Sequence, residues 1–391
     1  MYKTLKDYSR SQKRKIGIFL AFKKGYYFTS SYIRILSPLN ELSDEFDFEI
    51  IDYSSRKRFM KDLDKNLISM DAVIISRDID IISKDIEFVR SLYEKLKRNN
   101  VKIIFDIDDN ILLIDENHTE YAYYSRLIEY FRFLIENSDV LTVSTPHLKH
   151  ELEKYNRNIV VIPNTLMREW DFSQKQKTGD LSKKQKIKIG YFGTRTHGPD
   201  LKLLEEAVIN VKKHFTDKTI EFEMVGVTKT KYDWITPLPL PNNYRKNPNI
   251  IDHMLNMAMK VVDLTGFTVE LPHRQFIEWM KNETDWDIGV APLQDNRFNR
   301  NKSNLKYLEY GALNVAGVYS NVEPYKEIKT KNSGIVVENT SEEWENALVS
   351  LIENRNLYRT VIANCRRDIC KNYTVRNSSE RWREILKQIQ S

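Results

Sequence analysis

Cysteine is nearly absent from this chain of 391 residues. The two cysteines, Cys365 and Cys370, lie near the C-terminus with four residues between them. No histidine stands close to them, so the pair does not indicate a zinc site, and one pair excludes a disulfide framework. We therefore expect reduced thiols in a helix of a cytosolic protein.

Long apolar runs are also missing. No segment reaches the ~18 apolar residues that a membrane-spanning helix requires. The run IGIFLAF at 16–22 is flanked by basic residues and lacks a small-residue cleavage site, so it predicts a strand and not a signal peptide. These absences predict a protein that is made and kept in the cytoplasm.

No excess of one charge dominates the chain, which has 61 basic and 55 acidic residues and a net charge of +6. Such evenly mixed charge disfavours a nucleic-acid-binding module, which needs a concentrated basic face. It suits anionic partners such as nucleoside diphosphates. The first 15 residues are denser in cations, which suits either peripheral contact with an anionic membrane at its inner face or a solvated terminus.

What the chain does contain is an almost regular alternation of short apolar runs and amphipathic stretches. The expected strands are 15–21, 48–53, 71–77, 102–108, 140–145, 159–164, 186–192, 220–226, 287–293, 315–319 and 334–337. The expected helices are 29–42, 84–98, 121–137, 146–155, 200–214, 251–260, 272–282, 304–313, 341–354, 355–371 and 376–389. This alternation predicts parallel sheets covered on both faces.

A polar stretch interrupts the alternation at 166–186 and is expected to be a linker. It divides the chain into an N-terminal domain, 1–170, and a C-terminal domain, 187–373. The fold class is therefore α/β, with two Rossmann-like doubly wound domains. A ligand is expected in the cleft between them, because such sheets bind ligands beyond the carboxyl ends of their strands.

The most informative segment extends from Trp286 to Ser320. It predicts a buried strand, a polar loop, a helix and a second strand. Lys302, Lys306 and Glu309 are spaced to share one helical face, and a helix start reinforced by lysines suits a diphosphate. The carboxylate suits a sugar hydroxyl. An exposed ion pair on a solvated face accounts for the same spacing.

A second segment opens the C-terminal domain, where a strand leads into Gly193 and then a polar turn. The turn carries Thr194, Arg195, Thr196 and His197. Gly193 allows the backbone to approach a phosphate or a sugar closely. The turn has neither the dinucleotide-binding nor the Walker pattern, which disfavours hydride transfer and P-loop hydrolysis. An ordinary strand-to-helix turn remains the alternative.

Together these segments resemble glycosyltransferases of the GT-B fold, in particular the family-4-like group of bacterial surface-polysaccharide synthesis. The similarity rests on GYFGTRTHGPDL, WDIGVAPL and FNRNKSNLKYLEYGAL, and in the first domain on VIISR, FDIDDN, SDVLTVST and VIPN. It covers nearly the whole chain. It implies that the C-terminal domain binds a nucleotide-sugar donor, that the N-terminal domain binds the acceptor, and that the last helix, 374–391, packs back on the N-terminal domain.

The resemblance also assigns residues on the donor side. Glu309 matches the carboxylate that holds the ribose, while Asn301 stands where the family has a second acid. The donor-binding set is Gly193, Thr194, Thr196, Asn301, Ser303, Asn304, Leu305 and Glu309. The catalytic set, which neutralises the leaving diphosphate, is Lys302, Lys306, Arg195 and His197.

The acceptor side is assigned to the ends of two strands in the first domain. It consists of Arg77, Asp108, Asp109 and His118. Asp106, Asp108 and Asp109 also form a cluster of the kind that binds a divalent metal in GT-A glycosyltransferases, and Mg²⁺ is the alternative there. The resemblance implies a metal-free design without a cofactor.

The function implied is sugar transfer, with retention of anomeric configuration, onto a glycan or lipid-linked acceptor in cell-surface polysaccharide or glycoconjugate synthesis. Two alternatives share the fold. A GT-B nucleotide-sugar epimerase needs acid and base groups in the cleft and no acceptor. A non-catalytic partner subunit of a transferase is suggested by the missing acid at Asn301 and the missing arginine at Thr194.

Overall fold

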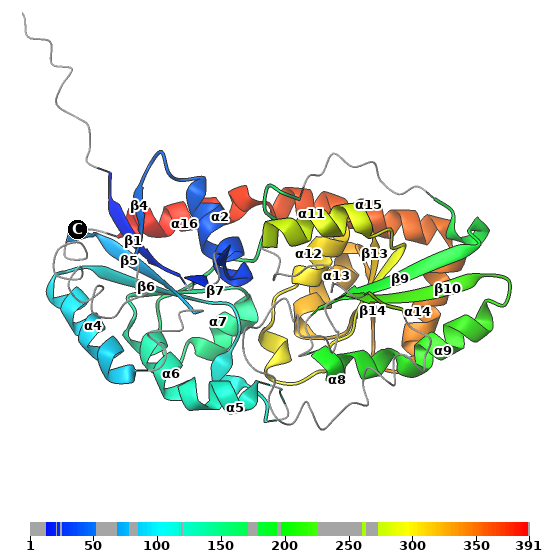
Figure 1. Ribbon diagram of the computed structural model, residues 1–391, viewed down its shortest axis with the longest axis horizontal. Helices are drawn as coiled ribbons and strands as arrows, with labels where there is room; N and C mark the ends of the chain where they lie inside the picture. The colour runs from blue at the N-terminus through cyan, green and yellow to red at the C-terminus, as the bar shows by residue number, and fades with distance from the viewer. Residues whose placement is uncertain are drawn as a thin grey trace, which may run out of the picture.

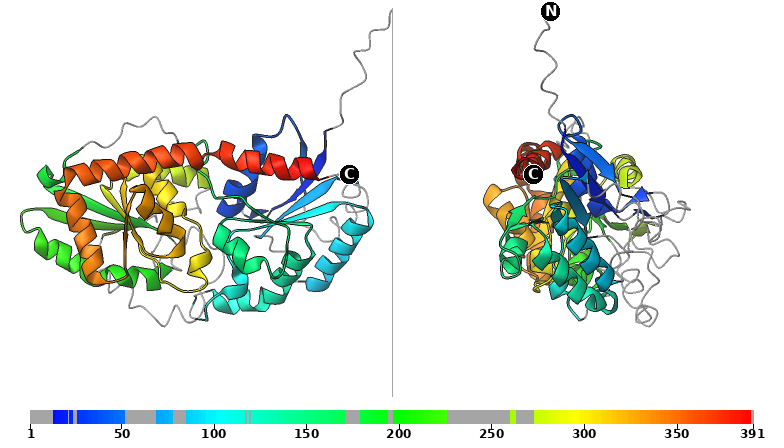
Figure 2. Two further views of the ribbon diagram at one scale, coloured as in Figure 1. Left: turned by 180° about the vertical axis from the view of Figure 1, so that it is seen from behind. Right: turned by 90° about the vertical axis from the view of Figure 1, so that its left-hand side faces the viewer.

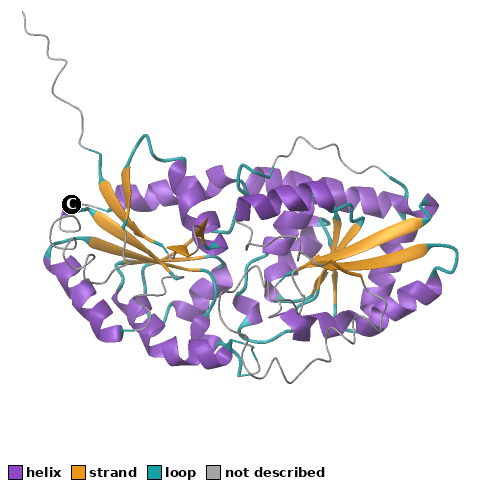
Figure 3. Ribbon diagram, in the orientation of Figure 1, coloured by secondary structure: helices purple, strands orange, loops and turns teal. Residues whose placement is uncertain are grey.

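Two parallel β-sheets, one in each half of the chain, form the framework of the molecule (Figure 1). The computed structural model describes residues 13–20, 22–23, 26–51, 69–77, 85–116, 118, 120–170, 179–193, 197–225, 260–262 and 273–389. Helices flank both sheets (Figure 3). The predicted α/β class with two doubly wound domains is confirmed.

The N-terminal sheet has six strands in the order β4-β1-β5-β6-β7-β8 among the residues described. Its strands are β1 (Lys15–Phe19), β4 (Asp47–Ile50), β5 (Ala72–Ser76), β6 (Lys102–Ile107), β7 (Val140–Val143) and β8 (Ile159–Val161). All of its strand pairs are parallel. Strand β5, with the sequence AVIIS, is buried along its whole length, as expected for a central strand covered on both faces.

Helices cover both faces of this sheet and form two separate cores. They are α1 (Thr29–Ser31), the π-helix η1 (Tyr32–Leu36), α2 (Ser37–Asn40), α4 (Ile86–Arg98), η4 (Ile111–Leu113), α5 (Tyr121–Tyr124), η5 (Ser125–Leu127), α6 (Ile128–Asn137) and α7 (Pro146–Leu152). A short antiparallel pair, β2 (Phe22–Lys23) with β3 (Tyr26–Tyr27), follows β1. Helix α4 begins where the Asp85 carboxylate accepts the Phe88 N–H at 3.0 Å, a standard N-cap.

The C-terminal sheet has the strand order β11-β10-β9-β12-β13-β14, again for the part of the chain described. Its strands are β9 (Lys186–Phe192), β10 (Thr219–Val225), β11 (Lys260–Val262), β12 (Ile288–Ala291), β13 (Ala316–Ser320) and β14 (Ile335–Val337). The chain order reverses between β9 and β12, because strands are added on one side of β9 first and then on the other. Ligands bind at such a reversal, beyond the carboxyl ends of the two strands.

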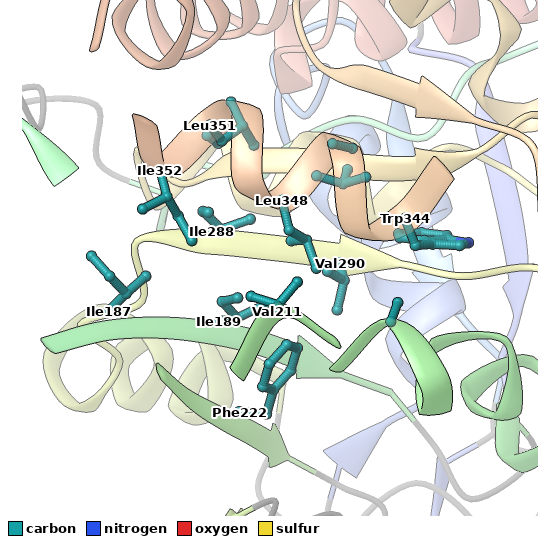
Figure 4. Close-up of a cluster of buried hydrophobic side chains, with 14 of the residues drawn as sticks. Ile187, Ile189, Val211, Phe222, Ile288, Val290, Trp344, Leu348, Leu351 and Ile352 are labelled. Atoms are coloured by element: carbon teal, nitrogen blue, oxygen red, sulfur yellow. The ribbon is translucent and has the colours of Figure 1, made fainter. Parts of the chain in front are cut away.

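Helices also cover this second sheet. They are η6 (Leu181–Lys183), α8 (Gly198–Leu201), η8 (Lys202–Leu204), α9 (Glu205–His214), α11 (His273–Glu283), η10 (Asn299–Asn301), α12 (Leu305–Ala312), η11 (Glu323–Tyr325), α13 (Lys326–Lys331), α14 (Ser341–Glu353) and α15 (Arg355–Asn372). On one face, α14 places Trp344, Leu348 and Leu351 over Ile288 and Val290 of β12 (Figure 4).

Two glycines allow aromatic rings to pack on the centre of the other face. A Cβ at Gly190 would lie 1.8 Å from the Trp286 ring, and one at Gly289 would lie 2.8 Å from the Tyr310 ring. Neither strand could carry a larger residue without displacing these rings. Phe192 stacks on Trp286 with 6.0 Å between the ring centroids, so a rigid aromatic layer supports the end of β9.

The C-terminal helix α16 (Val375–Gln388) leaves the second domain and packs against the first (Figure 2). Trp382 is fully buried there, and its Nε1–H donates to the Arg34 carbonyl at 2.8 Å. Ser379 Oγ donates to the Pro38 carbonyl at 3.0 Å. Where the two connections between the domains pass each other, the Leu166 N–H donates to the Tyr373 carbonyl at 2.8 Å.

Several expected elements differ from the structure. The stretch 166–170 is not a solvated linker, because Leu166, Met167 and Trp170 are buried in the core that also holds the aromatic layer. Lys260 begins strand β11 instead of ending a helix, and the rest of the helix expected at 251–260 lies outside the described residues. Helices η11 and α13 were not expected, since residues 321–333 lack a clear apolar period. No helix in the described part is long and apolar enough to cross a membrane.

We predict that Trp382→Ala destabilises the N-terminal domain by about 3–5 kcal/mol, because it leaves a large cavity and frees the Arg34 carbonyl. Urea unfolding followed by circular dichroism measures the effect. Arg381→Ala, an exposed change on the same helix, is the matched control and should stay within about 0.5 kcal/mol of the parent. Equal losses in both variants would contradict the docking role of Trp382.

Candidate active site in the interdomain cleft

The predicted donor site lies at the reversal between β9 and β12. Strand β9 ends at Phe192, and Gly193 follows it with its N–H donating to the Val225 carbonyl at 3.1 Å. The loop after β12 leads through η10 to helix α12. Thr194, Arg195 and Thr196 lie outside the described residues, so their predicted roles remain predictions.

The start of α12 combines free backbone amides with two ammonium groups. In the described part of the chain, the N–H groups of Leu305 and Lys306 have no hydrogen-bond acceptor, as expected for the first turn of a helix. Lys302 Nζ lies 4.9 Å from the Phe298 ring centroid, and Lys306 Nζ lies 5.2 Å from that of Tyr191. The aromatic faces hold both cations in place, and the whole arrangement suits an anion.

Glu309 lies one turn further along α12 and is only 4% exposed. No described residue donates a hydrogen bond to its carboxylate, and Lys306 is its one interacting charge. Burial raises the pKa of Glu309, which the charge of Lys306 only partly offsets. The alternative of a solvated Lys306–Glu309 ion pair is therefore wrong. A carboxylate that is almost inaccessible and has no protein donor is left with little water around it, and a ligand with hydroxyl groups would satisfy it.

Helix α12 is buried on all sides and not on one face alone, because Tyr307 through Ala312 are all inaccessible. Burial lowers the pKa of Lys306, against the attraction of Glu309. Asn301 is fully buried as well, and its Nδ2 donates to the Arg297 carbonyl at 2.6 Å. Its Oδ1 has no hydrogen-bond partner in the described structure.

His197 lies at the start of α8 and is paired with Asp200. Its Nδ1 is 2.8 Å from one Asp200 carboxylate oxygen, and the other oxygen accepts the Gln294 N–H at 2.7 Å. Burial and the nearby charge of Lys306 lower the pKa of His197 to about 4, despite the opposing effect of Asp200. The ring is therefore neutral at physiological pH.

In the N-terminal domain, two carboxylates predicted to bind the acceptor follow the end of β6 and are paired with one arginine. Arg77 lies 3.1 Å from Asp108 and 2.7 Å from Asp109. Burial alone would raise the pKa of Asp109, but Lys302 and Arg77 together hold it below its usual range. Asp109 is therefore ionised, and it faces a cation of the opposite domain.

Asp106 is separate from these two and belongs to the interior. Arg34 binds its two oxygens at 2.8 and 2.6 Å, and the Thr142 hydroxyl donates to it at 2.6 Å. The three aspartates therefore do not converge on one point. Within the described residues, no three His, Cys, Asp or Glu side chains are placed to hold a metal ion.

The two sides meet at a small pocket that holds about 60 Å³. His118 and Asp115 line it from the N-terminal domain, and His197, Asp200 and Lys302 line it from the other. Ligand sites usually measure roughly 300–1,000 Å³. The pocket therefore has room for the reacting end of a substrate and not for a whole nucleotide sugar.

Direct contacts fix how the domains meet beside this pocket. Asn164 Nδ2 donates to Ser303 Oγ at 2.8 Å, and the rings of His118 and Phe298 are 5.1 Å apart, edge to face. Burial and the charge of Lys302 lower the pKa of His118 to about 4. His197, Lys302 and His118, predicted from distant parts of the sequence, thus lie in one pocket.

Sequence reasoning missed Asp200, Asn164 and Phe298 as parts of the site. The spacing of His197 and Asp200, three residues apart at a helix start, was a usable signal for the pair. Asn164 and Phe298 stand in the motifs VIPN and FNRNKSNLKYLEYGAL, but the sequence did not show what they contact, because their partners lie more than 100 residues away in the chain.

No protein-family model matches the sequence, and no curated protein matches it. Solved structures do match. HepE of Anabaena, in complex with UDP and glucose, is 11% identical, with 96% of this chain and 99% of that one covered at a TM-score of 0.63. A glycosyltransferase from Rickettsia africae is 14% identical, with 96% and 98% covered at a TM-score of 0.61.

The chain has the GT-B fold. A third GT-B structure, described as a UDP-N-acetylglucosamine 2-epimerase of Listeria monocytogenes, is 10% identical over 96% of each chain at a TM-score of 0.51. The shared feature is the arrangement of two Rossmann-like domains. Among the residues described above, Asp115, His118, His197, Asp200 and Lys302 line the pocket between the two domains of this chain. The narrower likeness to the family-4-like group remains a prediction.

We predict that Glu309→Gln stabilises the protein as the pH rises. Because the pKa of Glu309 is higher in the folded state than its ordinary value of about 4.5, the wild type loses stability as the pH rises from that value to the folded-state pKa. Glutamine does not titrate, so the variant does not lose this stability. The variant's advantage in melting temperature should therefore be larger at pH 8 than at pH 5, measured without ligand. The exposed change Glu206→Gln is the control. A pH-independent difference would contradict the assignment of a costly buried carboxylate.

Proposed function

We propose that this protein is a glycosyltransferase that moves a sugar from a nucleotide-sugar donor to a hydroxyl group of a glycan or lipid-linked acceptor. The observation that carries the proposal is the nearly inaccessible carboxylate of Glu309, to which no described residue donates a hydrogen bond, on the helix whose start has free amides, Lys306 and the preceding Lys302. A nucleoside diphosphate satisfies all of these groups at once. Its ribose hydroxyls donate to the carboxylate, and its phosphates accept from the amides and lysines.

The comparisons support this donor class. HepE was solved with UDP and glucose, and also with UDP-glucose, and the similar Rickettsia protein is described as a glycosyltransferase. Those ligands belong to HepE. For this chain, the position of α12 at the strand reversal and the charges at its start make the same class of donor chemically suitable.

The proposed chemistry is mainly electrostatic. The bond between the sugar C1 and the diphosphate oxygen breaks, and its electron pair stays on the diphosphate. Lys302, Lys306 and Arg195, together with the α12 amides, neutralise that charge. The acceptor oxygen forms the new bond to C1, and its proton passes to the departing diphosphate oxygen. We assign retention of configuration from the resemblance alone. We assign independence of metal ions because Lys302, Lys306 and the start of α12 supply the positive charge that a metal would otherwise bring to the diphosphate.

The acceptor side of the proposal consists of Arg77, Asp108, Asp109 and His118. Asp108 and Asp109 are paired with Arg77 and remain partly exposed, with 15% and 26% of their side chains accessible. Ionised carboxylates at that position suit sugar hydroxyl groups, which donate to them. Closure of the domains, held by Asn164 and Ser303, excludes water and limits donor hydrolysis.

The biological setting that we propose is synthesis of surface polysaccharide or another glycoconjugate, in the cytoplasm or at the inner face of the membrane. Of the six cations proposed to contact anionic lipid, Lys3, Lys6 and Arg10 lie outside the described part of the chain, whereas Lys13, Arg14 and Lys15 lie within it.

An epimerase is the second candidate, and one observation favours it. Two neutral histidines and Asp115 share the interdomain pocket, where an epimerase needs proton-transfer groups. The two functions differ in the need for an acceptor. An epimerase converts its nucleotide sugar alone, whereas the transferase releases nucleoside diphosphate faster when an acceptor is added.

We predict that one class among UDP-, GDP-, dTDP- and ADP-sugars raises the melting temperature and is hydrolysed slowly. EDTA should leave both effects unchanged, because lysines perform the role of a metal. Differential scanning fluorimetry and a nucleoside diphosphate release assay measure them. Loss of both effects in EDTA would overturn metal independence. Binding without any turnover would favour the non-catalytic partner, and no binding at all would overturn the proposed function.

We predict that Lys302→Ala and Lys306→Ala each lower kcat by roughly 10²–10³-fold, the usual cost of removing one group that stabilises developing charge. Melting temperatures should change little for Lys302, which is partly exposed. Lys329→Ala, an exposed change on α13, is the matched control and should retain full turnover. Unchanged kcat in both cleft variants would contradict the diphosphate assignment.

A further inference from the structure

The interdomain pocket contains two imidazole rings, one from each domain, and in both rings Nδ1 is already engaged. His118 follows η4 in the N-terminal domain, and His197 begins α8 in the C-terminal domain. Both line the same pocket. Nε2 is therefore the ring nitrogen that each histidine has available for a ligand.

The partners of the two Nδ1 atoms require opposite tautomers. The Nδ1 atom of His118 accepts the backbone N–H of Glu120 at 3.2 Å, so the proton of this neutral ring must be on Nε2. The Nδ1 atom of His197 lies 2.8 Å from an Asp200 oxygen, and a carboxylate only accepts. The proton of His197 is therefore on Nδ1, and its Nε2 carries a lone pair.

Asp200 is itself held firmly. It is 5% exposed, and its second oxygen accepts the Gln294 N–H at 2.7 Å. The charged groups that act on His197 are Lys302 and Lys306 on the loop and helix after β12, together with Asp200 on its own helix. The two lysines oppose a second proton on the ring, so Asp200 orients a neutral imidazole and does not create an imidazolium.

We propose that Asp200 is a positioning residue that holds His197 in the Nδ1–H tautomer, so that the pocket presents a hydrogen-bond acceptor, His197 Nε2, and a donor, His118 Nε2–H, to substrate hydroxyl groups. A hydroxyl both donates and accepts, and it therefore matches this neutral pair. A phosphate lacks the proton that His197 Nε2 requires. The pair therefore selects the carbohydrate part of the substrate, while Lys302 and Lys306 take the diphosphate. This inference rests on the proposed function for the identity of the substrate.

The tautomers are measured directly on the full-length protein, with ¹⁵N-labelled histidine and long-range ¹H–¹⁵N correlation spectra. Variants His197→Gln and His118→Gln assign the two signals. The expected result is a proton on Nδ1 of His197 and on Nε2 of His118. A proton on Nε2 of His197 in the wild-type protein overturns the proposal, and this result requires neither turnover nor a known substrate.

The variant Asp200→Asn tests the consequence. The asparagine Oδ1 still accepts the Gln294 N–H, while its Nδ2 donates to His197 Nδ1 and forces the ring proton onto Nε2. We expect the His197 signals to report this tautomer and kcat/KM for sugar transfer to fall by roughly 10–100-fold, the range for one misdirected buried hydrogen bond. Asp217→Asn, which removes the same charge from an exposed turn of the same domain, should change neither.

Binding of the nucleoside diphosphate separates the two proposals. Asp200→Asn should bind the diphosphate selected by the donor screen as well as wild type does. The proposed contacts of the diphosphate are with Lys302, Lys306 and the start of α12, and not with Asp200. A switched tautomer with unchanged kcat/KM overturns the role toward substrate hydroxyls. Failure of wild type to bind any nucleotide overturns the proposed function, and the tautomer spectra still decide whether Asp200 orients His197. If Asp200→Asn does not fold, the wild-type spectra alone remain decisive.

Discussion

The buried guanidinium of Arg34 connects parts of the molecule that are far apart in the chain. It binds both oxygens of Asp106, the Ile162 carbonyl and the amide oxygen of Asn164. The Arg34 carbonyl also accepts from Trp382. A buried charge is tolerated only when it is paired and hydrogen-bonded, and losing one partner of such a pair costs about 3–5 kcal/mol. Arg34 therefore holds together the end of β6, the segment after β8 and the C-terminal helix α16. Asn164, in the segment after β8, also donates a hydrogen bond to Ser303 of the other domain.

The carboxylate of Glu309, at the predicted donor site, differs from Asp106 in its surroundings. Glu309 is as inaccessible as Asp106 but lacks the donors that would compensate its burial. A buried polar group that lacks hydrogen bonds lowers the stability of the free protein. Proteins retain such a group where a bound ligand supplies the missing hydrogen bonds. The aromatic layer of Phe192, Trp286 and Tyr310 supports this site with a closely packed core. That packing offsets the loss of stability that the Glu309 carboxylate causes.

Between the domains, neutral groups replace charges. His118 and His197 both have pKa values lowered to about 4, because burial and the lysines disfavour a second proton. Cations on one side, ionised aspartates on the other and neutral rings between them divide the cleft into regions of distinct chemistry. A substrate with an anionic end and a hydroxyl-rich end matches that division.

The sequence by itself determined the class of fold and the location of helix α12, the helix predicted to bind the donor. Strand and helix periods are local, and Lys306, Glu309 and the apolar positions of 305–312 lie on one continuous helix. Lys302, expected on the same helical face, instead lies in extended backbone before the helix. Only the tertiary structure decided that Glu309 is almost inaccessible with no donor among the described residues, and that Asp106 belongs to the interior while Asp108 and Asp109 pair with Arg77. It also decided that His118 meets Phe298 of the other domain. Those contacts join residues 31 to 180 positions apart in the chain. Local periodicity does not encode them, because burial and pairing depend on which distant surfaces the fold brings together.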